Sequence, residues 1–206
     1  MRSKLVASLA FVGGMTISSL ASQAVTIPAP VGPLETDMSF TRHVSGGATG
    51  GAAALSFDLL GYNSLDGVNF YQDNFIFTLN GIEILNAAFD LGGGGANQIF
   101  QNLMTGYTQS GGSPGIFSGG TISISGLINL LAGDNVLTFG YASLATPNNA
   151  GFQGLGDEGW GINNLDVTAA AVLPSAVPLP PAGFLLGAGL CGLFSLGGRK
   201  KYRKAV

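Results

Sequence analysis

Residues 25–178 contain no amphipathic helical pattern; short runs of β-prone residues alternate there with turns rich in Gly, Asn, Ser and Asp. The clearest unit places Asn80-Gly81 between the alternating runs 75–79 and 82–85. Asn-Gly is a strong hairpin signal because a type I′ turn requires positive φ at both central positions. This pattern predicts two antiparallel strands joined by a two-residue turn.

Five further segments have the composition or the period of two that strands require. Around Ile122 and Ile124, for example, apolar and polar residues alternate strictly. Strands at this spacing, without helical crossovers, favour an all-β fold, an antiparallel β-sandwich or jelly roll, over a parallel α/β fold. The glycine run 92–95 lacks the Lys and Ser or Thr of a phosphate-binding loop and predicts a flexible connection. The further predicted strands are residues 55–60, 87–91, 116–125, 136–143 and 160–167.

The cations are concentrated at the two ends of the chain. Residues 25–178 hold all eleven carboxylates and a single cation, Arg42, so this body carries a net charge of −10 although the whole chain sums to −3. Such a body repels phosphate backbones, so nucleic acid is not expected as a partner, whereas divalent cations and neutral sugars are compatible. The only Cys, Cys191, lies in the C-terminal apolar segment, so the body has no disulfide and depends on packing, hydrogen bonds and bound ions.

Residues 1–24 have the three-part layout of a secretory signal peptide. Arg2 and Lys4 precede an apolar stretch, and Ser22 and Ala24 occupy the −3 and −1 positions of a cut after Ala24. We therefore expect signal peptidase to remove this segment; the alternative is a short N-terminal membrane anchor. A linker over residues 25–36 would then lead into a β-sandwich domain over residues 37–168.

The C-terminal segment predicts a transmembrane helix over residues 182–198, after a Pro- and Ala-rich linker over residues 169–181. The helix has no charge and would be about 25 Å long at ~1.5 Å per residue, just short of a ~30 Å hydrocarbon core. The basic residues after it should stay cytoplasmic, which leaves the acidic body outside. This cytoplasmic anchor consists of Arg199, Lys200, Lys201, Arg203 and Lys204.

The segment 177–204, VPLPPAGFLLGAGLCGLFSLGGRKKYRK, combines a short Pro motif, an apolar helix and a basic end. This order resembles a PEP-CTERM sorting tail, with Pro-Leu-Pro where the family motif has Pro-Glu-Pro. The resemblance implies recognition by an exosortase, a membrane-embedded Cys peptidase, and association with exopolysaccharide or biofilm matrix. The protein would be anchored in the inner membrane before processing, and would then reach the cell surface or extracellular matrix. The sorting motif consists of Val177, Pro178, Leu179, Pro180 and Pro181.

Two stretches of the body carry weaker resemblances. Residues 130–139 resemble a turn and strand of carbohydrate-binding jelly rolls, and residues 154–167 resemble the closing strand of secreted β-sandwich domains that precede PEP-CTERM tails. Both resemblances imply a β-sandwich, and they say more about the fold than about the activity.

Most catalytic machinery is missing from the body. His43 is the only His and there is no Cys, which excludes a Cys-His dyad and a zinc site needing several such ligands. No Gly-x-Ser-x-Gly elbow surrounds any Ser, so we expect His43 to be a polar strand residue. A glycosidase needs only two carboxylates, for instance Asp157 and Glu158 with a distant partner, but nothing in the sequence selects a pair. We expect a protein without enzymatic activity.

A cluster of oxygen-bearing side chains near residue 160 suggests a structural calcium site. Calcium takes six to eight oxygen ligands, and neighbouring glycines allow backbone carbonyls to turn inward. Asp66, Asp73 and Asn74 could join from a nearby strand pair. The alternative is that these Asp and Asn residues are ordinary turn formers. The candidate ligands are Asp157, Glu158, Asn163, Asn164 and Asp166.

Trp160 invites a second hypothesis, stacking on a sugar ring, although a single Trp inside a strand more often belongs to the core. Other aromatic residues offer an alternative platform if they are exposed. Three functional classes remain open: a carbohydrate-binding module, a structural matrix or adhesion component, and a hydrolase with two facing carboxylates. The leading interpretation is a non-enzymatic surface or matrix protein. The alternative aromatic platform consists of Tyr62, Phe70, Tyr71, Tyr107 and Tyr141.

Overall fold

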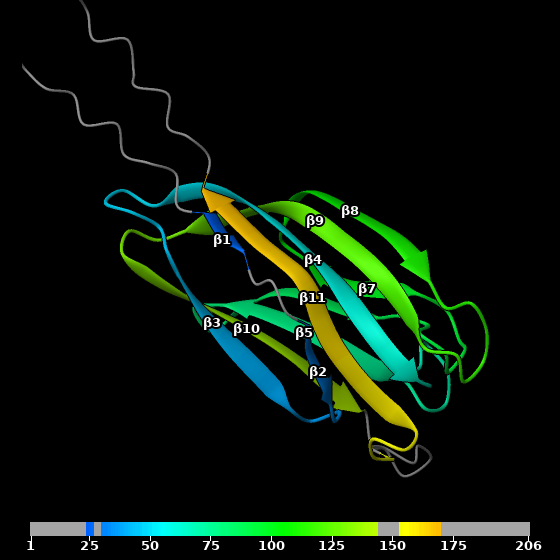
Figure 1. Cartoon of the computed structure of the whole chain (residues 1–206). Coiled ribbons are helices and arrows are strands. Elements are labelled where there is room, and N and C mark those ends of the chain that lie inside the picture. The colour runs from blue at the N-terminus through cyan, green and yellow to red at the C-terminus, as the bar shows by residue number, and fades with distance from the viewer. Residues whose placement is uncertain (1–23, 27–29, 144–152, 170–206) are drawn as a thin grey trace, which may run out of the picture. The chain divides into compact units, whose positions relative to one another are not determined.

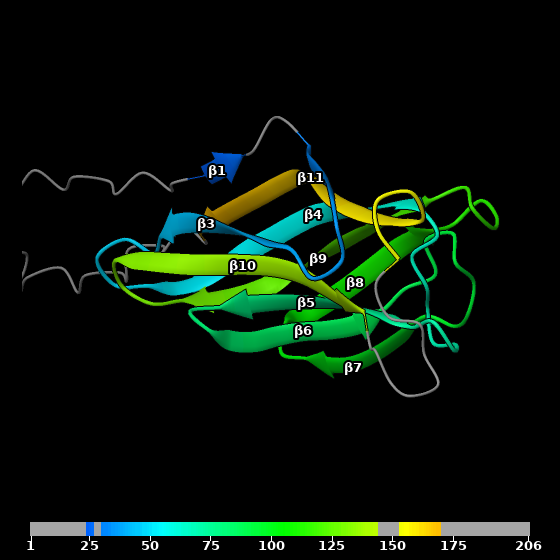
Figure 2. The same cartoon turned by 90° about the horizontal axis from the view of Figure 1, so that it is seen from below.

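The computed structural model, which describes residues 24–26, 30–143 and 153–169, consists of two antiparallel sheets packed face to face (Figure 1). The described residues form strands and turns without a helix, which confirms the predicted antiparallel β-sandwich. The six-stranded sheet contains, in spatial order, β1 (Ala24–Thr26), β11 (Glu158–Ala169), β4 (Gly51–Asn63), β9 (Gly120–Leu130) and β8 (Thr105–Gly112), and β2 (Val31–Leu34) also pairs with β11. The five-stranded sheet, seen strand by strand in Figure 2, contains β3 (Ser39–Ser45), β10 (Asp134–Ser143), β5 (Asp73–Leu79), β6 (Ile82–Ala88) and β7 (Gln98–Asn102).

The core lies between the sheets and is built from alternate residues of each strand. In β4 every second side chain is buried, and in β10 Leu137, Phe139 and Tyr141 point inward in the same way. Phe139 stacks on Phe77 of β5 with ring centroids 4.9 Å apart and meets Phe57 of β4 edge-on at 5.3 Å. Such aromatic contacts add to the burial of apolar area, so this layer holds the two sheets together.

The predicted hairpin is confirmed. Asn80 and Gly81 have φ values of 53° and 80°, and they join β5 to β6 as the type I′ geometry requires. Predicted strands 55–60, 136–143 and 160–167 lie inside β4, β10 and β11.

Other strand predictions need correction. The segment 87–91 is strand only to Ala88, and the segment 116–125 only from Gly120, because Phe117 adopts positive φ in a turn. Strands β7 and β8 were not predicted from the sequence. Both are polar and mostly exposed, so they lack the apolar alternation that reveals a strand.

The predicted linker 25–36 also needs correction, because it contains strand. β1 pairs with the last residues of β11, and β2 pairs with β11 near Trp160. Backbone pairing with a neighbouring strand needs no apolar pattern, and Pro33 is tolerated at the edge of a sheet. The sequence of this segment therefore carries no strand signal and predicts a linker instead.

The predicted targeting segments lie almost entirely outside the described residues. This applies to residues 1–23 of the signal peptide, to the linker beyond Ala169 and to the whole sorting tail with its helix 182–198. In the part of the chain that the structure describes, no helix has the length and apolar character needed to span a bilayer. Export and sorting therefore stay predictions from the sequence.

The sandwich has two distinct ends. Connections 46–50, 80–81, 103–104 and 131–133 lie at the hairpin end, together with the start of β1 and the end of β11. Longer connections gather at the opposite end, which we call the loop end (Figure 1). The described connections of the loop end are residues 35–38, 64–72, 89–97, 113–119 and 153–157.

Candidate metal centre

Three carboxylates meet at the loop end of the core. Asp73 is the first residue of β5, Glu158 is the first residue of β11, and Asp66 lies in the connection 64–72. One oxygen of each lies within 4.8 Å of the others. Asp73 and Glu158 are completely buried and Asp66 is 4% exposed. The structure therefore gathers three acids from two sheets and a loop into one buried group, which we call the acidic triad.

The strand register explains why two of these acids point inward. Asp73 continues the inward-facing row of Phe75 and Phe77 in β5, and Glu158 continues the row of Trp160 and Ile162 in β11. Period-two alternation thus carries each carboxylate to the end of an otherwise apolar row.

Asp66 reaches the triad because its loop closes on itself. The Asp66 N–H donates to the Asp73 carboxylate at 3.0 Å, and the Asp73 N–H donates to the Asp66 carbonyl at 3.1 Å. The amide of Asn69 donates to the Asp66 carboxylate at 2.5 Å. Residues 66–73 therefore form a small loop whose two ends both supply triad members.

Burial raises the pKa of all three triad carboxyl groups, which disfavours the state with three negative charges. The pKa of Asp73 is raised from 3.8 to about 7. Desolvation is the largest cause and the charges of Glu158 and Asp66 add to it, while hydrogen bonds from the Ser143 hydroxyl and the Asp66 N–H act in the opposite direction. Desolvation also raises the pKa of Asp66 and of Glu158. A group of this kind is stable either when it binds protons or when it binds a cation.

No positive side chain among residues 24–26, 30–143 and 153–169 compensates the triad. Arg42 and His43 are the only basic residues there, and both lie on β3. Arg42 lies over the Phe40 ring and donates to the Thr41 carbonyl, while His43 contacts Asp134 at 2.7 Å at the hairpin end. His43 is thus the polar strand residue that the sequence predicts.

Neutral donors surround the triad. The Ser143 hydroxyl donates to Asp73 across the β10–β5 pair and lies 3.4 Å from Glu158. Glu158 also accepts from the Thr36 hydroxyl at 3.4 Å and from the backbone N–H and side-chain amide of Gln153, both at 3.2 Å. Several of these groups carry oxygens that a hard cation accepts as ligands.

Tyr141 adds an independent indication of a ligand. Its side chain is 3% exposed and on the same inward row as Ser143, and its hydroxyl has no hydrogen-bond partner among the residues that the structure describes. Burial raises the pKa of Tyr141 well above 10, and the charge of Asp73 raises it too, so the hydroxyl lies within electrostatic range of the triad. An unpaired buried hydroxyl is costly, and a bound ion or water would satisfy it.

The predicted calcium ligands divide into two groups. Glu158 belongs to the triad, and Asp157 is adjacent, with its carboxylate accepting from the Ser64 hydroxyl at 2.6 Å. Asn163, Asn164 and Asp166 do not join it: Asn163 is five residues further along β11, about 17 Å away at ~3.3 Å per residue.

Those three residues form a β-bulge instead. Asn164 has φ of 49° and donates to Asp58 at 2.7 Å, and Asp166 accepts from Thr168 at 3.0 Å. The register shift lets both Ile162 and Leu165 face the core despite their odd spacing. Asn163, Asn164 and Asp166 therefore match the alternative to calcium ligation, in which Asp and Asn residues shape the local backbone.

Asp66 and Asp73 are the more distant residues that the sequence suggested, and both belong to the triad. Asn74 does not: its amide pairs with Asn86 at 3.0 Å and accepts from Gln72 at 2.7 Å. Tyr141 and Asn69 were not predicted from the sequence as residues of this site. Nothing in the sequence shows that the Tyr141 hydroxyl lies within electrostatic range of Asp73, or that the Asn69 amide donates to Asp66.

Trp160 has no face open to a ligand. It is completely buried, its indole N–H donates to the Glu35 carbonyl at 2.8 Å, and it packs against Phe40 and Tyr141 with centroids 6.0 and 5.7 Å away. Stacking of a sugar on Trp160 is therefore ruled out by its burial. Among the alternative aromatics, Phe70 and Tyr71 are 53% and 42% exposed.

The triad fits calcium on chemical grounds. Two ligands at ~2.4 Å from one ion lie at most ~4.8 Å apart, so three oxygens within 4.8 Å of each other can share a calcium ion. Oxygen-only donors exclude a soft-metal site, and no positive side chain competes for the carboxylates among the described residues. A buried acidic group that could hold a metal ion is thus present.

Comparisons with known proteins give little for this chain. No family model matches the sequence, and no curated protein is significantly similar to it. Among solved structures, a native family 35 carbohydrate binding module from Clostridium thermocellum is 16% identical, with 71% of this chain and 88% of that chain covered and a TM-score of 0.31. The EclA C-terminal domain, described as a sugar-binding protein, is 10% identical, with 74% and 82% covered and a TM-score of 0.32. Likenesses this distant carry no weight for function.

Proposed function

We propose that this chain is an exported, non-enzymatic binding module of the cell surface or extracellular matrix, and that a structural calcium ion holds together the loop end of its sandwich. The observation that carries the calcium proposal is the buried acidic triad Asp66, Asp73 and Glu158. A calcium ion would neutralise two of its three charges and tie two sheets and a loop to one point. Because the body has no disulfides, the bound ion would be the cross-link between these parts of the fold.

Burial of the triad also supports a binding or structural role over hydrolysis. Glycoside hydrolases need two carboxylates on either side of a substrate in an open cleft, ~5 to ~9 Å apart. Asp73 and Glu158 are inaccessible to a polysaccharide. The export part of the proposal is supported by the signal-peptide layout and by the PEP-CTERM-like tail. This part of the proposal predicts that signal peptidase cuts the chain after Ala24 and that an exosortase processes the C-terminal tail.

Thermal unfolding with and without calcium tests the calcium site. The full chain, purified in mild detergent, would be melted in 1 mM calcium and in chelator, with Trp160, the only Trp, as the fluorescent reporter. A ligand at 100 times its Kd stabilises by ~2.7 kcal/mol, which raises Tm by roughly 5–10 °C. Identical melting temperatures in the two buffers would overturn the site.

Two variants assign the effect to the triad. Asp73→Asn keeps the shape of the side chain but removes one anionic ligand, and it should lose most of the calcium-induced rise in Tm. Asp134→Asn makes the same change at an exposed carboxylate of the hairpin end and should retain the full rise. Equal calcium responses in both variants would show that calcium acts elsewhere.

A further inference from the structure

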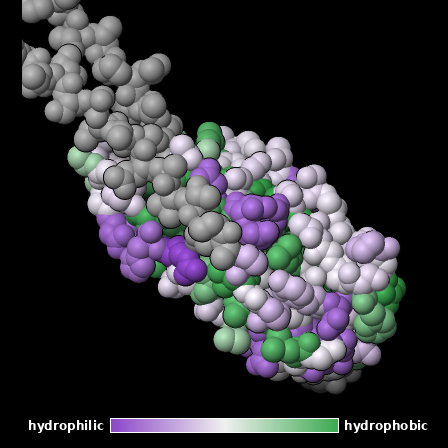
Figure 3. Space-filling model, viewed as in Figure 1, coloured by the Kyte–Doolittle hydropathy of each residue, from purple (hydrophilic) through white to green (hydrophobic). Residues whose placement is uncertain are grey.

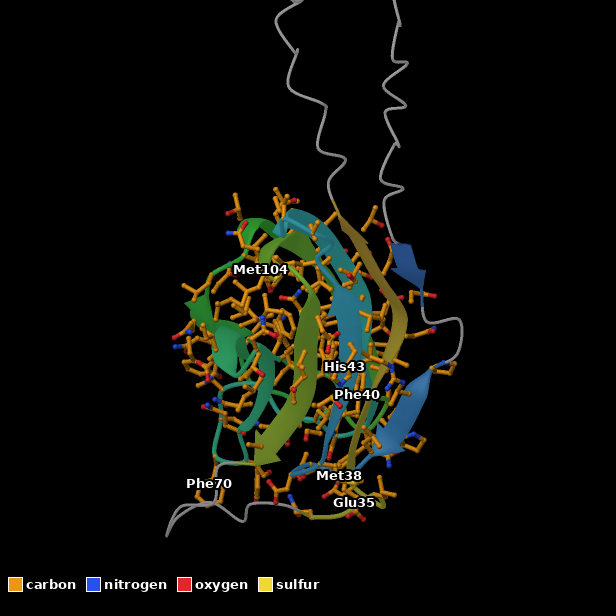
Figure 4. All side chains as sticks on the ribbon, turned by 90° about the vertical axis from the view of Figure 1, so that its left-hand side faces the viewer. Glu35, Met38, Phe40, His43, Phe70 and Met104 are labelled. Carbon is orange, nitrogen blue, oxygen red and sulfur yellow. The ribbon has the colours of Figure 1, made fainter. Side chains whose placement is uncertain are left out.

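The loop closed by the triad displays two adjacent aromatic side chains. Phe70 and Tyr71 lie at the tip of residues 66–73, with ring centroids 4.9 Å apart and planes at 84°. Both are substantially exposed, and Figure 4 places Phe70 at the end opposite Met104, which lies between β7 and β8. Two neighbouring aromatic side chains that keep 53% and 42% of their surface in solvent leave apolar area uncovered, so their position suits contact with a ligand.

A continuous set of bonds connects these aromatics to the acidic triad. Asn69 donates to the Asp66 carboxylate and accepts from the Tyr71 N–H at 2.6 Å. The loop is also fixed to residues 94–96, because the Val68 N–H donates to the Ala96 carbonyl at 2.8 Å. Whatever holds the Asp66 carboxylate therefore also holds the backbone of Tyr71.

Charge restricts the ligand that this end can accept. Seven carboxylates, including the triad, lie in or beside the loop-end connections, whereas Arg42, the only Lys or Arg among the described residues, is on β3. Anionic polysaccharides, nucleic acids and anionic lipid surfaces would be repelled. In Figure 3 apolar side chains on the visible face form small groups, one of them at the lower right, where the loop end lies. Small apolar groups beside polar ones match the alternating C–H and hydroxyl faces of a neutral sugar better than a large protein interface.

We propose that Phe70 and Tyr71, whose ring planes are nearly perpendicular, form an angled platform against which a neutral polysaccharide packs, and that the cation at the acidic triad keeps this platform in its binding geometry. The second part rests on the calcium site proposed above. A preformed platform loses little conformational entropy on binding, so the cation should strengthen binding without touching the sugar. Calcium would then regulate adhesion to matrix polysaccharide as well as stability.

Affinity gel electrophoresis of the full chain tests the platform. The gels would contain a soluble β-glucan, a galactomannan or dextran as neutral probes and carboxymethyl cellulose as the anionic probe, each with calcium or with chelator. We expect retardation by at least one neutral polysaccharide, none by carboxymethyl cellulose, and an affinity several-fold lower in chelator. Failure of all three neutral probes to retard the protein would overturn the platform.

A matched pair of variants locates the contact. Phe70→Ala/Tyr71→Ala should weaken binding at least tenfold while keeping the calcium-induced rise in Tm. Ile116→Ala/Phe117→Ala removes another exposed pair of the loop end, 60% and 69% exposed, and should change binding less than twofold. Equal losses in the two variants would contradict the assignment to residues 70 and 71.

The outcomes separate this inference from the proposed calcium site. A calcium-induced rise in Tm without retention on any neutral polysaccharide would leave the calcium site standing and remove the platform. Retention that depends on Phe70 and Tyr71 but not on calcium would remove the coupling. Sedimentation provides a further check: a dimer that dissociates in the Phe70→Ala/Tyr71→Ala variant, without glycan binding, would identify the pair as a self-association surface and overturn the proposal.

Discussion

Gly93 lies directly against the carboxylate of Asp66. A Cβ atom added to Gly93 would fall 2.3 Å from Cγ of Asp66 and 2.4 and 2.6 Å from its two oxygens. Gly92 likewise has no room for a side chain, since its Cβ would lie 1.9 Å from the Asn63 carbonyl oxygen. The glycine run 92–95, which the sequence predicts as a flexible loop, is packed onto the connection that carries Asp66.

This contact predicts that Gly93→Ala weakens the calcium response without replacing any of the candidate metal-ligating residues. The new methyl group must push the Asp66 carboxylate away from Asp73 and Glu158, so the calcium-induced rise in Tm should fall by at least half. Gly156→Ala is the matched control, because a Cβ there meets nothing within 4 Å. Thermal melts of both variants in calcium and in chelator check this, and a full response in Gly93→Ala would contradict the geometry.

The raised pKa values predict how the metal-free protein responds to pH. The pKa of Asp73 is 3.8 ordinarily and about 7 in the fold, so the folded state binds more protons than the unfolded state between these values. Its free energy of unfolding should therefore fall as pH rises from about 4 to about 7. In chelator we expect Tm to drop by roughly 5 °C or more between pH 5 and pH 7.5.

Asp73→Asn is the control for this pH effect, because an amide does not titrate and the slope of Tm against pH should become much shallower. Calcium should also flatten the slope in the parent protein, since the bound ion replaces the protons. A metal-free Tm that is constant or rises over this pH range would show that the triad is not the dominant titrating group.

Tyr141→Phe tests the unpaired hydroxyl. A buried hydroxyl that lacks a partner costs ~1–3 kcal/mol of folding free energy. Without a cation, its removal should therefore leave Tm unchanged or raise it. With calcium, the rise in Tm should be smaller than in the parent protein, because a buried oxygen within electrostatic range of Asp73 is gone. Differential scanning calorimetry in both buffers measures this. A large loss of stability in chelator would mean that the hydroxyl has a partner after all.

Asn135 provides a prediction at the opposite end. It is completely buried, its side-chain oxygen accepts from the Leu131 N–H at 2.8 Å and from Asn80 at 2.9 Å, and its amide donates to the Leu131 carbonyl at 2.9 Å. Asn135→Ala leaves these groups unpaired and should destabilise the fold by ~2–4 kcal/mol. Asn129→Ala, on an exposed residue of β9, should change stability by less than ~0.5 kcal/mol, as urea unfolding would verify.

Local signals in the sequence were sufficient for the framework of the fold. Asn80-Gly81 specifies its own turn geometry, and alternating runs such as 55–60 specify which side chains face the core. The strand β8 was not accessible in this way, because it is polar and mostly exposed. The short strands β1 and β2 were not accessible either, because they are held by backbone bonds to β11, which is distant in sequence.

The candidate site was accessible only in part, for a related reason. Four of the predicted ligands are close in sequence: Asp157, Glu158, Asn163 and Asn164. A strand separates successive residues by ~3.3 Å, so these residues are spread along β11 instead of meeting at one point. Asp66 and Asp73 are about ninety residues from Glu158, and they reach it because β5 and β11 both begin at the loop end of the sandwich. Which acids meet is thus a property of sheet topology.

Strand β11 runs from Glu158 in the triad to Ala169 beside the start of β1, and the steps between its twelve residues, at ~3.3 Å each, add up to about 36 Å. It is therefore a built-in spacer. A label or support attached at the hairpin end, for instance through the connection 131–133, would lie a full strand length from Phe70 and Tyr71 and would not obstruct long polymers from reaching them.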